Sequence, residues 1–293
     1  VLLYVAPERL RSPAFMDVLG KRIESDGGLE HVVVDEVHCV NQWGYEFRPD
    51  YFHAMEHLLH RLRDDNEGEP SPFLLLSATV TASDRARLMA LLNAHPSRQL
   101  TNQLLVRPDA FTNPLRAHIE VSPQRVHGRI NDKKGFAQAV EERLPVMVDA
   151  IAAARRNKQA TGQRSAVIVF VAWRMQAEEL AALLAPHVEG GIDYYHAGLD
   201  GTTRNEIYLR FREGELDVLV ATKAFGMGMD IPDIHWVVHL GPPTYLEDYL
   251  QEVGRIGRGV AERQRAGLKS LQASLLFSNA DFESNRDLRA QGA

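Results

Sequence analysis

The sequence of 293 residues has little cysteine, no long apolar run and no excess of positive charge. Cys39 is its single cysteine, which excludes an intramolecular disulfide and a zinc site built from several cysteines, so we expect a reducing cytoplasm. No stretch approaches the roughly 20 apolar residues that span a bilayer, and no signal-peptide pattern stands at the start, so no membrane partner is expected. The net charge of −6 excludes a small basic protein that coats DNA.

The positive charge is concentrated in residues 116–164, which contain ten Lys and Arg against five Asp and Glu. A basic patch on an acidic protein is typical of a nucleic-acid channel or groove. The alternative is that these side chains only solvate a linker and a helix, and we favour it for most of them.

Strand-like and helix-like segments alternate along the chain, which indicates an α/β fold with parallel sheets. We expect strands at residues 1–5, 31–35, 73–77, 117–121, 166–171, 192–195, 217–221, 235–239 and 272–277. We expect helices that begin near Ser12, Pro49 and Thr81 or Ser83, and further helices over 136–156, 174–185, 203–213 and 245–253.

The stretch 95–135 interrupts this alternation, because it is rich in Pro, Asn, His and basic residues. We therefore divide the chain into a first α/β domain over 1–115, a basic linker with a lead-in helix over 116–164, and a second α/β domain with a polar tail over 165–293. Val1 stands directly in an expected strand, so we expect the first domain to be truncated at its amino end and the chain to be part of a longer protein.

The most informative stretch begins with the apolar run 32–34, which is followed by Asp35, Glu36 and His38. Ligands of parallel sheets bind at the carboxyl ends of the strands. One carboxylate there can hold a hydrated Mg²⁺ that bridges nucleotide phosphates, and its neighbour can activate the attacking water. The alternative is a helix N-terminal signal, which is equally common for Asp-Glu after a strand.

Three further motifs follow strands or lie on a helix. Ser77 and Thr79 can bridge to the Asp-Glu site or can simply cap a helix. In VATKAFGMGMD, Thr222 offers a hydroxyl contact, Gly228 permits close backbone approach, and Asp230 can bind a ribose hydroxyl, although such glycines also occur in plain turns.

The last motif, QEVGRIGR, places Arg255 and Arg258 three residues apart on a predicted helical turn. Guanidinium groups so placed can clamp a polyphosphate and stabilise a transferring phosphoryl group. Alone, the motif would be read as two solvated arginines.

The ordered set of motifs resembles the RecQ-like DNA helicases of superfamily 2 over about residues 1–277. The matching segments are LLYVAPERL, DEVH with QWGYEFRPDY, SAT, VIVFVAWR, YYHAGL, VLVATKAFGMGMDIP and QEVGRIGRG. The aromatic-rich loop within QWGYEFRPDY favours this family over the rest of the superfamily.

The resemblance implies two tandem RecA-like domains that use ATP and Mg²⁺ to move 3′→5′ on single-stranded or partly duplex DNA. It implies that Asp35 holds Mg²⁺ through water, that Glu36 activates the hydrolytic water, and that Arg258 is the arginine finger. Other nucleotide-site residues implied by it are His38, Gly228, Asp230, Gln251 and Arg255. The nucleic-acid contacts that it implies are Trp43, Tyr45, Phe47, Arg48, Ser77, Thr79, Arg174, His196 and Thr222.

The sequence also departs from the family. No GxxxxGK[ST] pattern is present, so we expect these 293 residues alone to hydrolyse no ATP. The family's four-cysteine zinc module is absent from this sequence, so no zinc is expected. Asp230 and Lys223 replace the residues that are more usual at their positions, which indicates a divergent member. Two alternatives stay open: a non-catalytic DNA-binding or scaffolding subunit of a larger repair or defence assembly, and an RNA helicase of the same superfamily.

Overall fold

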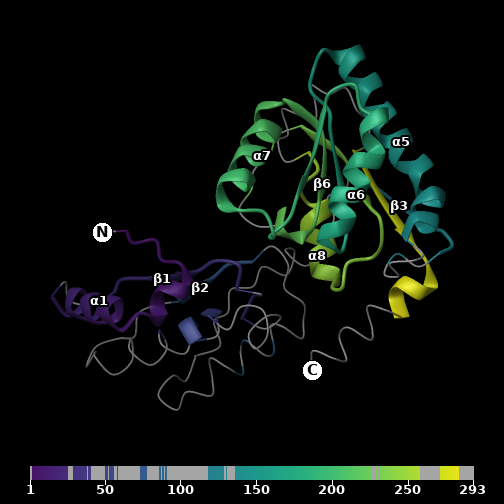
Figure 1. Cartoon of the computed structure of the whole chain (residues 1–293). Helices are drawn as coiled ribbons and strands as arrows, with labels where there is room; N and C mark the ends of the chain where they lie inside the picture. Colours follow the sequence, from purple (N-terminus) through teal and green to yellow (C-terminus); the bar gives the residue numbers. More distant parts are fainter. Residues whose placement is uncertain are drawn as a thin grey trace. The chain divides into compact units, whose positions relative to one another are not determined.

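The computed structural model divides the chain into two compact units, Val1–Thr112 and Asn113–Ala293, and each is described by itself (Figure 1). The residues that the structure describes are 2–25, 29–37, 39–40, 50–51, 53–55, 58, 73–77, 86, 88, 90, 118–128, 130, 136–225, 229, 231, 233–257 and 271–283.

The first unit contains a short parallel pair of strands with helices beside it. Its elements are η1 (Pro7–Arg11), α1 (Pro13–Ser25), β1 (Val32–Val34) and β2 (Phe73–Leu75). Residues 50–51, 53–55, 58, 86, 88 and 90 are helical, in agreement with the helices expected after Pro49 and after Thr81 or Ser83. In the pairing of β1 with β2, Val34 lies beside Leu75, so both strands end at the same edge.

The strand expected at residues 1–5 is wrong for the described residues 2–5, which form no strand. Leu2 and Tyr4 are 77% and 88% exposed, and among the described residues no strand pairs with this segment. A β-branched or aromatic run becomes a strand only where its backbone groups find a neighbouring strand.

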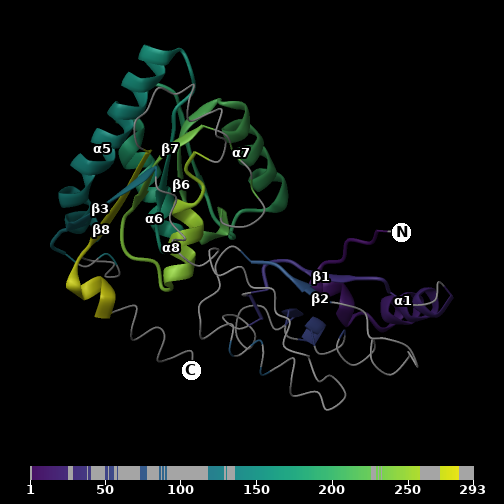
Figure 2. The same cartoon turned by 180° about the vertical axis from the view of Figure 1, so that it is seen from behind.

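The second unit is built on one parallel sheet of six strands in the order β3-β8-β7-β4-β6-β5 (Figures 1 and 2). The strands are β3 (Ile119–Arg125), β4 (Ala166–Phe170), β5 (Gly191–Tyr195), β6 (Leu216–Ala221), β7 (Ile234–His239) and β8 (Leu271–Phe277). The helices are α5 (Phe136–Thr161), α6 (Arg174–Leu184), α7 (Gly201–Glu213) and α8 (Leu246–Val253), with short 3₁₀ turns η3 (Ala185–His187) and η4 (Lys223–Phe225).

Helices cover both faces of this sheet. Along the fully buried strand β4, Val167 and Val169 pack in the cluster that contains side chains of α5 and α6. Ile168 and Phe170 pack in the opposite cluster, with side chains of α7 and α8. A parallel sheet that is covered on both faces needs apolar residues at every position of its central strands, which explains the sequence AVIVF.

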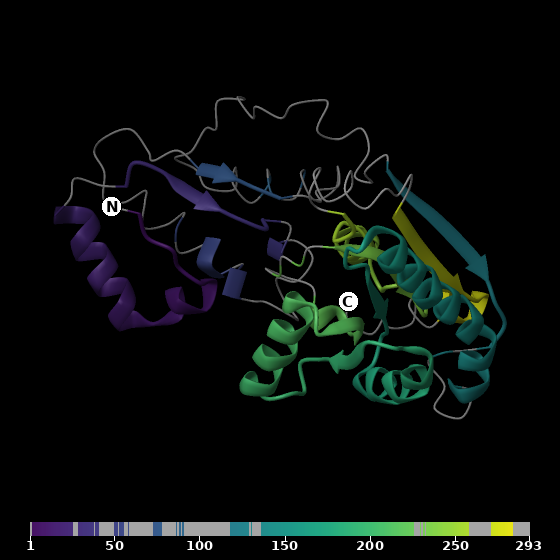
Figure 3. The ribbon, with the colours of Figure 1, turned by 90° about the horizontal axis from the view of Figure 1, so that it is seen from above.

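The doubly covered parallel sheet confirms the predicted α/β class. In the second unit, each strand and helix lies within a few residues of its expected position. The stretch 116–164, expected as a linker with a lead-in helix, supplies β3 and α5, and Figure 3 shows α5 running along the part of the sheet that contains β3 and β8. The boundaries at 115 and 165 stay a prediction. Among the described helices, none has the length and apolar character that crossing a bilayer requires.

Candidate nucleotide site and nucleic-acid interface

The predicted carboxylates of the first unit lie in a tight turn directly after β1. Asp35 Oδ1 accepts a hydrogen bond of 2.8 Å from the Glu36 backbone N–H. Glu36 has φ of +51°, a left-handed conformation that is strained for a residue with a Cβ. Cys39 N–H donates to the Glu36 carbonyl at 2.9 Å, so the chain turns at once into a helical segment. The strain at Glu36 is the kind that folded proteins retain at functional positions.

Ser77 lies beside this turn because the strand pairing continues past β2. Leu76 N–H donates to the Val34 carbonyl at 2.9 Å, and Val37 N–H donates to the Leu76 carbonyl at 3.0 Å. The structure therefore brings Ser77 next to Asp35 and Glu36, at the carboxyl edge of both strands.

The donor set around Asp35 fits a magnesium ion held mainly by water and phosphate. Asp35 is exposed, and its carboxylate has further lone pairs beyond the one used by Glu36 N–H. In the part of the chain that the structure describes, no cluster of three or more His, Cys, Asp or Glu could cage a metal. Mg²⁺ in nucleotide sites needs only one or two carboxylates, because waters and substrate phosphates complete its octahedron.

The second unit gathers three predicted nucleic-acid residues at the carboxyl edge of its sheet. Arg174 begins α6 after β4, His196 follows β5 and Thr222 follows β6. Thr222 N–H donates to the Tyr195 carbonyl at 3.0 Å, which ties the ends of β5 and β6 together. The edge that carries these residues is the one at which parallel sheets bind ligands.

His196 is buried and held in one orientation. Its Nδ1 accepts from Gly198 N–H at 3.1 Å, so in the neutral ring Nε2 carries the proton and donates to Glu178 Oε1 at 2.9 Å. A Cβ at Gly198 would lie 3.0 Å from Arg174 Nη1 and 3.1 Å from His196 Nδ1. The loop after β5 therefore packs directly against the Arg174 side chain, which would have to shift to admit a Cβ at Gly198.

Thr222 is 7% exposed, and its Oγ1 accepts from Ala224 N–H at 3.4 Å. Its hydroxyl thus caps the turn η4, and its predicted contact with a phosphate stays a prediction.

Gln251 and Arg255 lie at the end of α8 and in the turn that follows it. α8 ends at Val253, so Arg255 is in the turn and not on the helix itself. Its guanidinium is 5.9 Å from the Phe225 ring centroid, and Nη1 donates to the Met229 carbonyl at 3.2 Å. Arg255 is only 3% exposed, so packing and this hydrogen bond fix its position.

Several predicted residues lie outside the described residues, and their placement stays a prediction. They are His38, Trp43, Tyr45, Phe47, Arg48, Thr79, Gly228, Asp230 and Arg258.

Sequence reasoning missed a buried pair that connects β7 to α8. His239 Nε2 and Glu252 Oε2 are 2.9 Å apart, and the two side chains are 1% and 6% exposed. The His239 ring also stacks on Phe170 at 5.3 Å. Glu252 lies within the QEVGR motif, and this motif was a signal in the sequence that could have indicated it. His239 lies thirteen residues away, and no motif indicated it.

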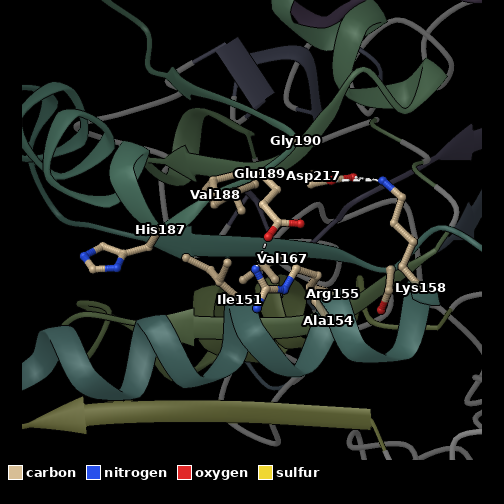
Figure 4. Close-up of a pocket in the computed structure, with 12 residues that line it drawn as sticks. Ile151, Ala154, Arg155, Lys158, Val167, His187, Val188, Glu189, Gly190 and Asp217 are labelled. Carbon is tan, nitrogen blue, oxygen red and sulfur yellow. Dashed lines mark hydrogen bonds and ion pairs between the residues drawn. The ribbon is translucent and has the colours of Figure 1, made fainter. Parts of the chain in front are cut away.

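A small pocket lies at the opposite edge of the sheet, near the amino ends of the strands (Figure 4). Ion pairs from α5 flank it: Arg155 with Glu189, and Lys158 with Asp217 at 2.8 Å. Its volume of about 30 Å³ is that of roughly one water molecule, so it offers no room for a nucleotide or a base.

Comparison with known proteins finds similarity to helicases. The DEAD/DEAH box helicase family matches residues 2–88, and the helicase conserved C-terminal domain matches residues 147–260. The probable ATP-dependent DNA helicase RecS of Bacillus subtilis is 32% identical over 257 residues, which are 87% of this chain and 43% of that protein. Over most of its length the chain is similar to the RecQ-like helicases of superfamily 2.

Other similar proteins agree with this assignment. ATP-dependent DNA helicase Q-like 2 of Arabidopsis thaliana is 31% identical over 96% of this chain and 34% of its own length. A structure of S. cerevisiae Dbp5 L327V bound to RNA and ADP BeF3 has a TM-score of 0.56 at 20% identity, covering 95% of this chain and 61% of that one. That likeness shows the fold alone. The chain spans less than half the length of the two curated RecQ-like relatives.

These similarities confirm the predicted resemblance and the tandem RecA-like fold. The roles of individual residues are a separate question. The geometry places Asp35, Glu36 and Ser77 together in one unit, and Arg174, His196 and Thr222 together in the other.

Proposed function

We propose that the chain is the motor core of an ATP-dependent DNA helicase or translocase, which hydrolyses ATP and moves 3′→5′ on single-stranded DNA. The observation that carries the proposal is the turn after β1, where Asp35 Oδ1 accepts from the Glu36 backbone N–H at 2.8 Å and both acidic residues follow the strand end. The names of the RecQ-like relatives, which are ATP-dependent DNA helicases, support the choice of ATP and DNA.

The residues suggest a division of labour in hydrolysis. Mg²⁺, when bound, would neutralise phosphate charge, and Asp35 would hold it through water. Glu36, whose backbone φ is +51°, would accept the proton of the attacking water. Arg255 and Arg258 would stabilise negative charge on the transferring phosphoryl group.

On the nucleic acid, Arg174 would contact a backbone phosphate, and the loop at Gly198 packs against its side chain. Trp43, Tyr45, Phe47 and Arg48 would form the loop that senses single-stranded DNA, since aromatic stacking tolerates any base sequence.

The sequence has no GxxxxGK[ST] pattern, and we propose that these 293 residues alone hydrolyse no ATP. This proposal would be contradicted if the isolated chain hydrolysed ATP and its Glu36→Gln variant did not.

The same missing pattern favours a second candidate, a non-catalytic DNA-binding or scaffolding subunit of a larger assembly. The two candidates separate in one experiment on the full-length protein, in which ATP hydrolysis is measured without nucleic acid, with single-stranded DNA and with single-stranded RNA. DNA-stimulated hydrolysis supports the motor, absence of hydrolysis with retained DNA binding supports the scaffold, and stronger stimulation by RNA supports an RNA helicase.

A further inference from the structure

A buried histidine stands at the end of a central strand of the second unit, where the fold otherwise calls for an apolar side chain. His239 is the last residue of β7, and in the sheet it lies between Phe170 of β4 and Leu275 of β8. Its side chain is 1% exposed. Central strands of a parallel sheet that is covered on both faces carry apolar residues, so an imidazole here needs a reason other than packing.

The imidazole is held in one orientation by two rings and a carboxylate. Its centroid lies 5.3 Å from that of the Phe170 ring and 4.8 Å from that of the Tyr249 ring. Nε2 is 2.9 Å from Glu252 Oε2, and because an ionised carboxylate only accepts, Nε2 is the nitrogen that donates. Among the described residues, the buried Nδ1 has no hydrogen-bond partner. An unpaired buried nitrogen costs stability that an apolar ring at this position would not cost.

The contacts of His239 with α8 come from one face of that helix. Tyr249 and Glu252 are three residues apart on α8, so their side chains are neighbours on its surface. The Glu252 side chain is only 6% exposed, so little water competes for its hydrogen bond with His239. Together the ring and the carboxylate fix how the last turns of α8 lie against the end of β7.

Glu252 transmits this position to Arg255. Its carboxylate binds His239, and its backbone carbonyl accepts a hydrogen bond of 3.3 Å from Arg255 N–H in the turn after α8. The far end of the same turn is anchored on β7, where Gly257 N–H donates to the Ile234 carbonyl at 3.0 Å. A movement of Glu252 therefore displaces the Arg255 backbone, because the two residues are joined by this hydrogen bond.

We propose that His239 is a positioning residue for ATP hydrolysis, which acts through Glu252 to hold Arg255 where charge develops on the transferring phosphoryl group. The inference rests on the proposed function, because it requires that Arg255 take part in hydrolysis. A guanidinium displaced by about 1 Å stabilises that charge poorly, and a misplacement of this size can cost about 100-fold in rate. In this role His239 contacts neither the nucleotide nor Mg²⁺.

The test is steady-state ATP hydrolysis by the full-length protein with saturating single-stranded DNA. His239→Phe keeps a flat ring at this position but removes the donor to Glu252. We expect kcat to fall by roughly 10- to 100-fold while KM for ATP stays nearly unchanged, because the lost interaction is one made in the transition state. His239→Gln can place an amide N–H near the position of Nε2, and it should recover part of the lost kcat.

The matched control is His235→Phe, which makes the same change on the same strand. His235 is 2% exposed, and its Nδ1 is 2.8 Å from Ser165 Oγ, so this variant also loses a buried hydrogen bond. Ser165 precedes β4 and is not on α8, so kcat should stay close to that of the unsubstituted protein. Urea unfolding of both variants shows whether their losses of stability are similar.

Two further variants separate positioning from general damage. Glu252→Met removes the acceptor from the other side of the pair, should lower kcat by a similar factor, and keeps the experiment decisive if His239→Phe does not fold. In an Arg255→Ala background, His239→Phe should cause little further loss, because both changes remove the same contribution. Losses that simply multiply would mean that the histidine acts by another route, and they would overturn the inference.

Unchanged kcat in His239→Phe and in Glu252→Met would overturn the inference, while hydrolysis by the unsubstituted protein leaves the proposed function standing. An equal loss of kcat in His235→Phe would overturn it as well, since general destabilisation of β7 would then explain the effect. Full activity of Arg255→Ala would remove the residue through which the histidine is proposed to act. Absence of DNA-stimulated hydrolysis by the unsubstituted protein would contradict the proposed function itself, and this inference with it.

Discussion

Removal of the Asp281 carboxylate is expected to destabilise the second unit more than any exposed ion pair could. Asp281 accepts hydrogen bonds from Ser278 N–H and Oγ–H, both at 2.8 Å, and from Ile130 N–H at 3.2 Å. It also pairs with Arg143 at 3.1 Å, where the two side chains are 3% and 0% exposed. It thereby joins α5 to the segment after β8, across the edge of the sheet.

The magnitude follows from what Asp281→Ala would leave behind. Burial already lowers the pKa of Arg143, and the carboxylates of Asp281 and Glu142 oppose this shift. Without Asp281, the Arg143 guanidinium keeps only carbonyl acceptors, at Ala139, His127 and Gly128. An uncompensated buried charge of this kind costs about 3–5 kcal/mol. For a unit of this size, that corresponds to a fall in Tm of roughly 6–20 °C.

The assay is thermal and urea unfolding followed by circular dichroism, with Lys158→Ala as the exposed control. Lys158 is 45% exposed in its pair with Asp217, so its loss should cost under about 1 kcal/mol. The double variant Arg143→Met with Asp281→Leu should recover part of the loss, since no charge then remains buried. A loss below about 1 kcal/mol for Asp281→Ala, or no recovery in the double variant, would refute the reasoning.

Three further predictions concern single residues. Burial raises the pKa of Tyr249 to about 12, and among the described residues its buried Oη has no hydrogen-bond partner. Because the folded-state pKa lies above the unfolded value, the stability that depends on a neutral Tyr249 is complete below pH of about 10 and is lost as pH rises through about 12. Tyr249→Phe should remove this alkaline loss of stability in urea unfolding, and it should raise the free energy of unfolding by about 1 kcal/mol at neutral pH. Arg174→Ala should lower the slope of log affinity for single-stranded DNA against log salt by about 1 for every sequence tested, and an unchanged slope would exclude a phosphate contact. Gly190→Ala would place a Cβ 2.0 Å from Asp217 Oδ2, so the carboxylate must rotate away from Lys158, at a cost of about 1 kcal/mol in the same unfolding assay.

The second unit was predictable because its signals are local. The strand Ala166–Phe170 is an uninterrupted apolar run, and parallel sheets with two covered faces require such runs. The end of α5 was less predictable, since the helix was expected over 136–156 and continues to Thr161. There Thr161 Oγ1 donates to the Asn157 carbonyl and Lys158 binds Asp217, so the helix continues through contacts that the local pattern does not show.

The sequence predicted which site residues lie together only where those residues directly follow strands. Asp35 and Ser77 are 42 positions apart, but each follows an apolar run, so parallel pairing was enough to predict that they lie together. The pair of Arg143 with Asp281 joins residues 138 positions apart, and neither residue stands in a recognisable motif. The strand expected at residues 1–5 also depended on a distant partner. A strand forms only beside another strand, and its own sequence does not specify that neighbour.

The most direct test of the central claim is the ATPase activity of the full-length protein and its Glu36→Gln variant, with and without single-stranded DNA. We expect DNA-stimulated hydrolysis by the unsubstituted protein and loss of turnover in Glu36→Gln, while ATP binding is retained, because only the group that activates water is removed. Unchanged turnover in Glu36→Gln would contradict the role of Glu36 in activating water.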